Sequence, residues 1–122
     1  MILLNDFYTI TSRDASDGAV RAKISINRAH KIFDGHFPGL PIVPGVCMMQ
    51  IIREIMEIIT ERSLLIAGAE NMKFLAVINP DQNREVDVSI TYTDDNGALN
   101  VNASIFAGTV TFFKLKAALK TS

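Results

Sequence analysis

The stretch that decides the fold runs from Val46 to Arg62 and reads VCMMQIIREIMEIITER. At the spacing of about 100° per residue in an α-helix, its polar side chains fall within an arc of about 120°. These polar residues are Gln50, Arg53, Glu54, Glu57, Thr60 and Glu61. Apolar side chains fill the rest of the circumference, which is a wider arc than a surface helix presents. We therefore expect a sheet to wrap this helix, or a sheet and a partner subunit to share it.

The segments on both sides of the helix predict β-structure. Several of them alternate apolar and polar side chains with the period of two that is typical of half-buried strands. Asp17-Gly18 and Asn96-Gly97 are hairpin signals, because both residues of each pair tolerate a positive φ. Strands are expected at residues 7–12, 19–26, 63–75, 85–93, 99–106 and 109–118. The fold class that follows is α+β, with an antiparallel sheet curling around one long buried helix.

Composition limits the class of protein. A chain of 122 residues with 48% hydrophobic side chains is expected to form a single domain over residues 1–122. Lys+Arg 12 nearly balance Asp+Glu 13, which argues against a nucleic-acid partner. The beginning of the chain predicts no signal peptide, and no apolar run suggests membrane insertion, so a cytoplasmic protein is expected. The lone Cys47 allows no internal disulfide and indicates no metal site.

Residues 30–45 interrupt every periodicity. They hold three of the four prolines and three of the seven glycines. This density predicts a rigid, irregular loop without regular helix or strand pairing. Long ordered loops in small domains are often functional, so we expect the loop to hold the site.

His36 and Gly45 are the candidate catalytic residues of this loop. An imidazole is the natural general base near neutral pH. The N–H of Gly45, at the start of the helix, can stabilise a developing oxyanion. Alternatively, Gly45 only permits the tight turn from loop to helix, and both interpretations can hold together.

Residues 34–46, DGHFPGLPIVPGV, resemble the signature of the 3-hydroxyacyl-[acyl-carrier-protein] dehydratases. Weaker similarity to this family extends over residues 26–33 and 72–80. The resemblance implies a hotdog fold, in which an antiparallel sheet wraps one long helix. It also implies dehydration of a (3R)-hydroxyacyl thioester to a trans-2-enoyl thioester, in fatty-acid or related polyene synthesis. The substrate would be carried on the phosphopantetheine arm of acyl carrier protein, with no other cofactor.

The resemblance also implies roles for single residues. His36 would take a proton from C2 of the substrate, and the Gly45 N–H would polarise the thioester carbonyl. A helix Glu or Asp, contributed across a dimer interface, would protonate the departing hydroxyl. Candidate substrate-binding residues are Phe37, Pro44, Val46, Met49 and Phe74. A basic rim for the acidic carrier protein is available from Arg28, Lys31, Lys73, Arg84, Lys114 and Lys116, although these side chains can equally be solvated surface.

The chain departs from the family pattern at the acid. The position of the family's acid is occupied by Gln50, and the position of a downstream family glutamine is occupied by Glu54. A glutamine amide can form hydrogen bonds with the substrate hydroxyl but cannot donate a proton and become an anion. The exchange therefore places the catalytic mechanism in question.

Four interpretations of the exchange remain open. Glu54 acts as a displaced acid, or is merely an exposed helix glutamate paired with a neighbour. A paralogous subunit supplies the carboxylate in a heterodimer. The chain has lost dehydration and binds acyl thioesters or serves another thioester reaction, such as a thioesterase. Finally, Gln50 orients the hydroxyl or a water in a slower enzyme. The expected assembly is a homodimer or a paralogous heterodimer, with a higher oligomer also open.

Overall fold

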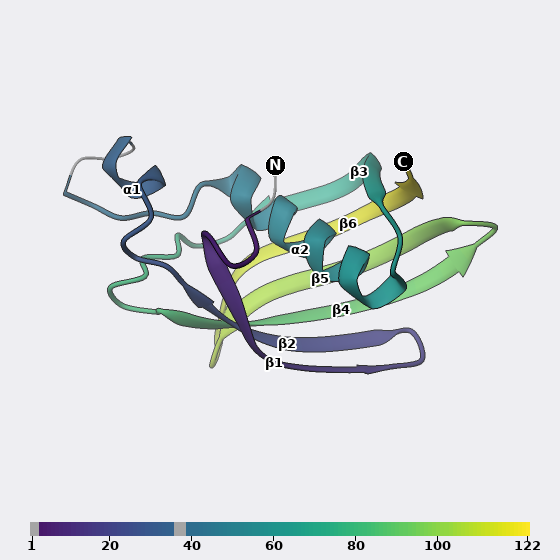
Figure 1. Cartoon of the computed structure of the whole chain (residues 1–122), viewed down its shortest axis with the longest axis horizontal. Helices are drawn as coiled ribbons and strands as arrows, with labels where there is room; N and C mark the ends of the chain where they lie inside the picture. Colours follow the sequence, from purple (N-terminus) through teal and green to yellow (C-terminus); the bar gives the residue numbers. More distant parts are fainter. Residues whose placement is uncertain (1–2, 36–38) are drawn as a thin grey trace.

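The computed structural model describes residues 3–35 and 39–122, which form a six-stranded sheet and one long helix (Figure 1). The elements in chain order are β1 (Tyr8–Ser16), β2 (Ala19–Ile26), α1 (Ile32–Gly35), α2 (Gly45–Thr60), β3 (Leu64–Phe74), β4 (Glu85–Asp95), β5 (Ala98–Ala107) and β6 (Val110–Thr121). Within these residues no helix is long and apolar enough to cross a membrane.

The strands follow the order β1-β2-β4-β5-β6-β3, and each neighbouring pair is antiparallel. Tight turns join β4 to β5 and β5 to β6. In the first of these turns Asn96 and Gly97 have φ of 54° and 87°, the left-handed values that the hairpin signal predicts. After α2, the chain pairs β3 with β6 at the edge opposite β1. The helix therefore lies between the two edges, in the hollow of the sheet.

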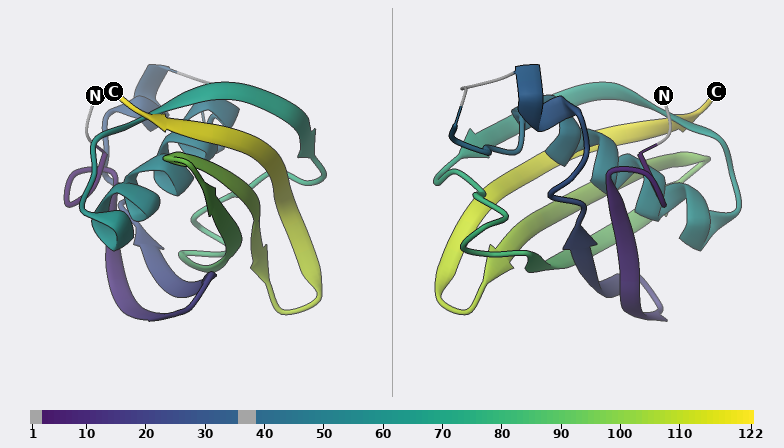
Figure 2. Two further views of the ribbon diagram at one scale, coloured as in Figure 1. Left: turned by 90° about the vertical axis from the view of Figure 1, so that its right-hand side faces the viewer. Right: turned by 60° about the vertical axis from the view of Figure 1, so that its left-hand side comes forward.

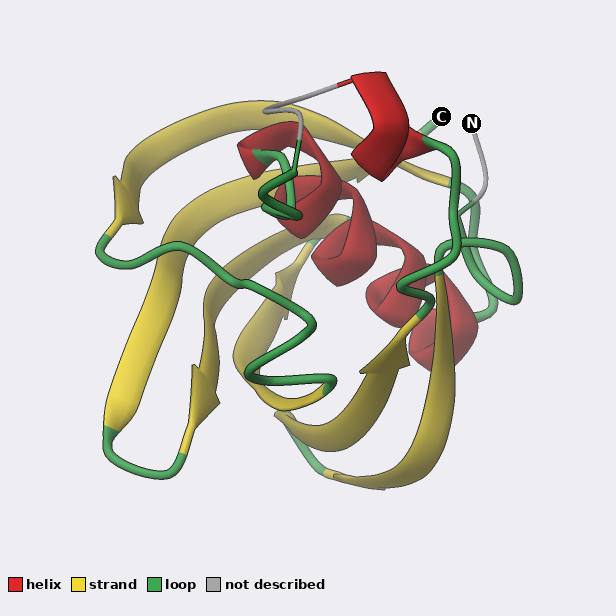
Figure 3. Cartoon of the chain, turned by 90° about the vertical axis from the view of Figure 1, so that its left-hand side faces the viewer, coloured by secondary structure: helices red, strands yellow, loops and turns green. Residues whose placement is uncertain are grey.

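The ribbon of α2 lies in the concave side of the sheet (Figures 2 and 3), and the buried side chains of the core come from the helix and the strands around it. Along β5, Leu99, Val101, Ala103 and Ile105 are buried, while the alternating residues Asn100 and Asn102 are exposed. Ile51 and Ile55 of α2 are also buried. Each such side chain contributes about 1.5–3 kcal/mol when it is removed from water. The predicted α+β class, with a sheet curled around one helix, is confirmed.

Two local predictions were wrong. Residues 30–45 contain the one-turn helix α1, although their composition predicted no regular helix. The first proline of the loop comes only after this turn, so the backbone N–H groups before it can still donate, as Phe33 N does to His30 O at 3.2 Å. The long helix ends at Thr60 rather than Arg62, because Glu61 takes the left-handed φ of 54° that terminates a helix.

Candidate active site

The predicted site residues divide into two groups. His36 and Phe37 lie outside the residues that the structure describes. Gly45, Gln50 and Glu54 lie on α2, and Pro44 immediately precedes it. The description of the site therefore begins at the N-terminus of α2.

Gly45 lies against the ring of Phe74, the last residue of β3. A Cβ at position 45 would come within 2.6 Å of Phe74 Cε1 and 2.8 Å of Cζ. Real Cβ atoms are not found so close to a neighbour, so the ring approaches this closely only because position 45 has no side chain. The ring centroid of Phe74 also lies 5.0 Å from that of Phe113, which supports the ring from the sheet. The structure thus brings together two residues that the sequence only suggested separately.

The N–H of Gly45 belongs to the first turn of α2. A helix leaves the N–H groups of its first turn without acceptors inside the helix, and its dipole favours negative charge there. Val43 N donates to Ile78 O at 3.0 Å, so the chain entering the helix runs beside the segment that follows β3. The start of α2 is therefore held on one side by this segment and covered by Phe74.

Apolar side chains around this end of α2 are exposed. Val46 is 66% exposed, Phe74 is 52%, and Leu75 and Val77 are 53% and 61%. Pro44 and Met49 are partly buried. Such a group of exposed apolar side chains is typical of a binding surface. We call Val46, Phe74, Leu75 and Val77 the apolar end patch.

Glu54 is buried, with 4% of its surface exposed, which contradicts the expectation of an exposed helix glutamate. Leu3 N donates to Oε2 at 2.8 Å, and Leu4 N donates to Oε1 at 2.8 Å. The Tyr8 hydroxyl donates to Oε1 at 3.1 Å. The carboxylate therefore fastens the N-terminal segment, Leu3–Tyr8, onto α2.

Gln50 is the fourth donor to this carboxylate. Its Nε2 lies 2.6 Å from Glu54 Oε2, and its Oε1 accepts from Arg53 Nε at 3.2 Å. In this orientation the amide nitrogen meets a carboxylate and the amide oxygen meets a guanidinium, so both groups have a suitable partner. Gln50 and Glu54, one turn apart on α2, are therefore directly hydrogen-bonded to each other.

Arg53 and Glu57 of α2 form hydrogen bonds with the backbone at the start of β3. Arg53 Nη1 donates to Leu64 O at 2.7 Å, and Leu64 N donates to Glu57 Oε2 at 2.8 Å. The polar arc of the helix is thus used for internal bonds at both the N-terminal segment and β3. Sequence reasoning missed Tyr8, because its partner Glu54 lies 46 residues away in the chain and no local pattern reveals the bond. It also missed the bond from Arg53 to the backbone of Leu64, which depends on how the chain returns from α2 into β3.

The Glu54 carboxylate also affects two neighbouring groups. Burial, and then the charge of Glu54, raises the pKa of the Tyr8 phenol well above its usual range. Burial, and then the same charge, raises the pKa of Cys47 to about 11. Tyr8 is therefore a stable hydrogen-bond donor, and Cys47 is a buried neutral thiol rather than a nucleophile.

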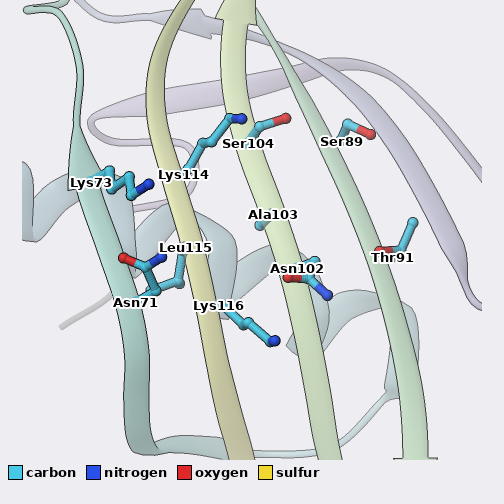
Figure 4. A pocket seen from close by; sticks show the side chains of 10 residues that line it. All are labelled: Asn71, Lys73, Ser89, Thr91, Asn102, Ala103, Ser104, Lys114, Leu115 and Lys116. Atoms are coloured by element: carbon cyan, nitrogen blue, oxygen red, sulfur yellow. The ribbon is translucent and has the colours of Figure 1, made fainter.

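An open depression of about 400 Å³ lies on the outer face of the sheet, away from α2 (Figure 4). Lys73, Lys114 and Lys116 line it together with polar side chains such as Asn71 and Ser104. Lys73 and Lys114 are directly opposite in the β3–β6 register. Three of the predicted basic residues therefore gather here, whereas Arg28 pairs with Asp81 at 2.9 Å. Among residues 3–35 and 39–122, no cluster of His, Cys, Asp or Glu is suited to hold a metal ion.

Comparison with curated proteins finds relatives among the 3-hydroxyacyl-[acyl-carrier-protein] dehydratases FabZ. The protein of Latilactobacillus sakei subsp. sakei (strain 23K) is 29% identical over 82 residues, which cover 62% of this chain and 57% of that protein. The protein of Haemophilus influenzae (strain 86-028NP) is 30% identical over 95 residues, which cover 67% and 63%. The chain thus spans less than two thirds of the length of these relatives.

Two solved structures share the fold. The dehydratase heterocomplex ApeI:P from Xenorhabdus doucetiae matches with a TM-score of 0.74 at 17% identity, over 91% of this chain and 96% of that chain. The dehydratase domain from the CurJ module of curacin polyketide synthase matches with a TM-score of 0.60 at 12% identity, over 93% and 42%. The predicted hotdog fold is confirmed by these neighbours.

A family model described as ApeI-like, ApeI dehydratase, matches residues 12–110. This range covers most of the chain, from β1 to the start of β6. It agrees with the resemblance that the loop signature carries. The chain belongs to the ApeI-like dehydratase family.

Proposed function

We propose that this chain is the histidine-bearing subunit of a 3-hydroxyacyl-[acyl-carrier-protein] dehydratase, and that a paralogous partner supplies the acid. Membership of a dehydratase family supports the reaction class. The FabZ relatives, whose name gives acyl carrier protein as the carrier of their substrate, support the thioester. The substrate is a (3R)-hydroxyacyl chain on a phosphopantetheine arm, and no other cofactor takes part.

The proposed reaction has two proton transfers. His36 takes the proton from C2, while the Gly45 N–H stabilises the negative charge that develops on the thioester oxygen. The electron pair from C2 forms the C2–C3 double bond, and the hydroxyl leaves C3 with a proton from a carboxylic acid. Water and a trans-2-enoyl thioester result. To complete the cycle, His36 releases the proton from C2 to solvent, and the partner's carboxylate takes up a proton from solvent.

The two-subunit proposal is supported by the hydrogen bonds of Gln50 and Glu54. Position 50, where the family has its acid, holds an amide whose nitrogen lies 2.6 Å from Glu54. Both oxygens of Glu54 accept from donors of the same chain, including two backbone N–H groups. Neither residue therefore offers a free carboxylic acid proton, and a carboxyl group from another subunit is the simplest source of one.

The apolar end patch and the edge strand β3 are the proposed interface. Among the described residues, β3 pairs with β6 alone, so its outer backbone groups are available to a further strand. Most of its residues are exposed, including Leu65 and Met72. The structure of a dehydratase heterocomplex with the same fold makes a paralogous partner the favoured occupant, ahead of a second copy.

Substrate contacts are proposed at the same end of α2. Pro44, Val46 and Met49 lie along the start of the helix, and Phe74 covers Gly45. Phe37, in the loop, completes the set. An acyl chain placed over the apolar end patch would bring its thioester carbonyl to the Gly45 N–H.

A dehydration assay tests this function. The purified chain is incubated with (3R)-hydroxyacyl carrier protein, alone and with a carboxylate-bearing hotdog paralogue, and loss of water is followed by mass spectrometry. We expect dehydration with the partner and little without it. His36→Ala should abolish the activity of the pair, whereas an active pair indifferent to His36→Ala would overturn the mechanism.

A non-catalytic, acyl-binding subunit is the second candidate, and the amide at Gln50 is the observation that favours it. Gln50→Glu separates the two functions. If His36 and Gly45 retain their roles, a carboxyl at position 50 should raise dehydration by the chain alone by roughly 10²-fold, the usual worth of a general acid. The binding subunit would be favoured if the chain binds acyl carrier protein but shows no dehydration. This result would have to hold for the wild type, for Gln50→Glu and for the chain mixed with the partner.

A further inference from the structure

Glu54 is buried and accepts hydrogen bonds at both oxygens of its side chain. Its carboxylate receives four donors: the N–H groups of Leu3 and Leu4, the Tyr8 hydroxyl and the Gln50 amide. A carboxylate offers about four lone-pair sites, so these donors use its whole capacity. Two of the donors are backbone groups that cannot accept a proton in return. Both oxygens of the side chain are therefore already engaged by donors of the same chain.

The Gln50 amide is held from both sides. Glu54 accepts from its nitrogen and Arg53 donates to its oxygen at 3.2 Å. Arg53 is itself fixed, because its Nη1 donates to Leu64 O at 2.7 Å at the start of β3. Rotating the amide by half a turn would place its oxygen against the Glu54 carboxylate and its nitrogen against the Arg53 guanidinium. Both contacts would then be repulsive, so one orientation is selected.

From this geometry we infer that Glu54 is a positioning residue that locks the Gln50 amide in one orientation, so that Gln50 acts on substrate as an oriented hydrogen-bonding group rather than an acid. The role of Gln50 toward substrate rests on the proposed function, but the lock itself does not. In this chain the amide lies at position 50 and the carboxylate that holds it lies one turn further along α2. The same carboxylate fastens the N-terminal segment, which links the order of that segment to the orientation of Gln50.

The lock is tested first without any activity measurement. In ¹⁵N-labelled protein, the side-chain amide signals of Gln50 should show one strongly shifted, slowly exchanging proton, because a charge-assisted hydrogen bond at this distance is strong. In Glu54→Gln this signal should return to the range of a solvated amide. Tyr8→Phe is the matched control, since it removes one donor from Glu54 but leaves Gln50 bonded, and its Gln50 signals should stay shifted. Unchanged Gln50 signals in Glu54→Gln would overturn the lock.

Thermal unfolding gives a second test, which separates the lock on Gln50 from a role of Glu54 in the N-terminal segment alone. Gln50→Ala should lower the Tm of the wild type by about 4 °C or more, the effect of losing one charge-assisted hydrogen bond in a chain of this size. In the Glu54→Gln background, the same substitution should shift the Tm by less than about 1 °C, because the bond is already lost. Equal losses in the two backgrounds would mean that Glu54 serves only the N-terminal segment.

Kinetics then connect the lock to the reaction. In the active pair of subunits, Glu54→Gln should lower kcat by about tenfold or more with KM changed less than about twofold, since the amide is misoriented while the binding surface is intact. Tyr8→Phe should leave kcat close to the wild-type value. If no pair dehydrates the substrate, the proposed function fails, while the amide signals and the unfolding series still decide the lock. Equal kcat losses in both variants would indicate that only the N-terminal segment matters.

Discussion

Gly45 has no side chain, and the ring of Phe74 occupies the space that a side chain would fill. The distance of 2.6 Å from the position of a Cβ to Phe74 Cε1 is too short for any other residue without movement of the ring. The ring is 52% exposed on its other side but is packed against Phe113. Glycine at position 45 thus allows the Phe74 ring to lie close to the backbone and places an N–H group at the start of α2.

Gly45→Ala should lower the free energy of unfolding by about 1–3 kcal/mol, because the Phe74 ring must leave its contact with Phe113. In the Phe74→Ala background the same substitution should be neutral, or stabilising by up to about 1 kcal/mol, since Ala favours helix over Gly. Urea denaturation of the four proteins measures both effects. The same cost in both backgrounds would show that Phe74 is not the obstacle.

Gln50→Glu places a second carboxylate beside Glu54, where the present contact is 2.6 Å. Two like charges this close raise the pKa of one of them above its unfolded value, and the stability gained from the shared proton is lost as pH rises through that pKa. We expect the variant to match the wild type below about pH 4 and to be less stable by about 1–3 kcal/mol near pH 7. Unfolding measured across pH checks this sign, and a pH-independent difference would contradict it.

At the scale of elements, α2 connects the separate parts of the fold. One arc of the helix fills the concave sheet, and the other bonds the N-terminal segment through Glu54 and the start of β3 through Arg53 and Glu57. The helix is therefore enclosed on its polar side as well, which explains why Glu54 is buried although its neighbours in the helical arc are polar.

Ile55 and Ile59 lie on α2 one turn apart and give a matched pair of substitutions. Ile55 is 2% exposed and packed in the core, while Ile59 is only partly buried. Ile55→Ala should cost about 2–5 kcal/mol, the range for deleting buried aliphatic groups, and Ile59→Ala should cost clearly less. Denaturant unfolding of the single chain provides the comparison. If a partner covers Ile59, its substitution should become more costly in the assembled pair than in the chain alone.

At the scale of the whole molecule, residues 3–35 and 39–122 leave the edge strand β3 and the apolar end patch exposed. Leu75 and Val77, which follow β3, are more than half exposed. An edge strand next to exposed apolar side chains is a template for association unless another chain covers it. The open edge and the apolar end patch therefore favour the assembly that we propose.

Leu75→Lys/Val77→Lys should weaken association, with Asn100→Lys/Asn102→Lys on the outer face of the sheet as the charge-matched control. Sedimentation of the chain alone, and mixed with a carboxylate-bearing paralogue, measures the assembly. We expect the wild type and the control to assemble with similar Kd. The Kd of Leu75→Lys/Val77→Lys should be higher by about tenfold or more, since assembly would bury two charges in the interface. A wild type that stays monomeric at micromolar concentration in both cases would contradict the predicted dimer.

The sequence by itself determined the long helix and the strands, the fold and the family, although it missed α1. The apolar arc of residues 46–62 and the alternation in the strands are local patterns that reflect burial, and they were sufficient to predict one helix inside an antiparallel sheet. The loop signature with His36 and Gly45 predicted the family in which the chain was then found. Local patterns also predicted the turn at Asn96-Gly97, because its backbone conformation depends on those two residues alone.

Only the tertiary structure decided how the polar residues of the helix are used. Glu54 meets the N–H groups of Leu3 and Leu4, about fifty positions away in the chain, and Phe74 meets Gly45 across the end of the sheet. The order of the strands, with β3 at one edge, brings these residues together. Periodicity reports whether a side chain is buried or exposed among its neighbours in the chain. It does not report a hydrogen bond to a distant segment, and for that reason a glutamate in a polar arc became the most enclosed charge among the residues described.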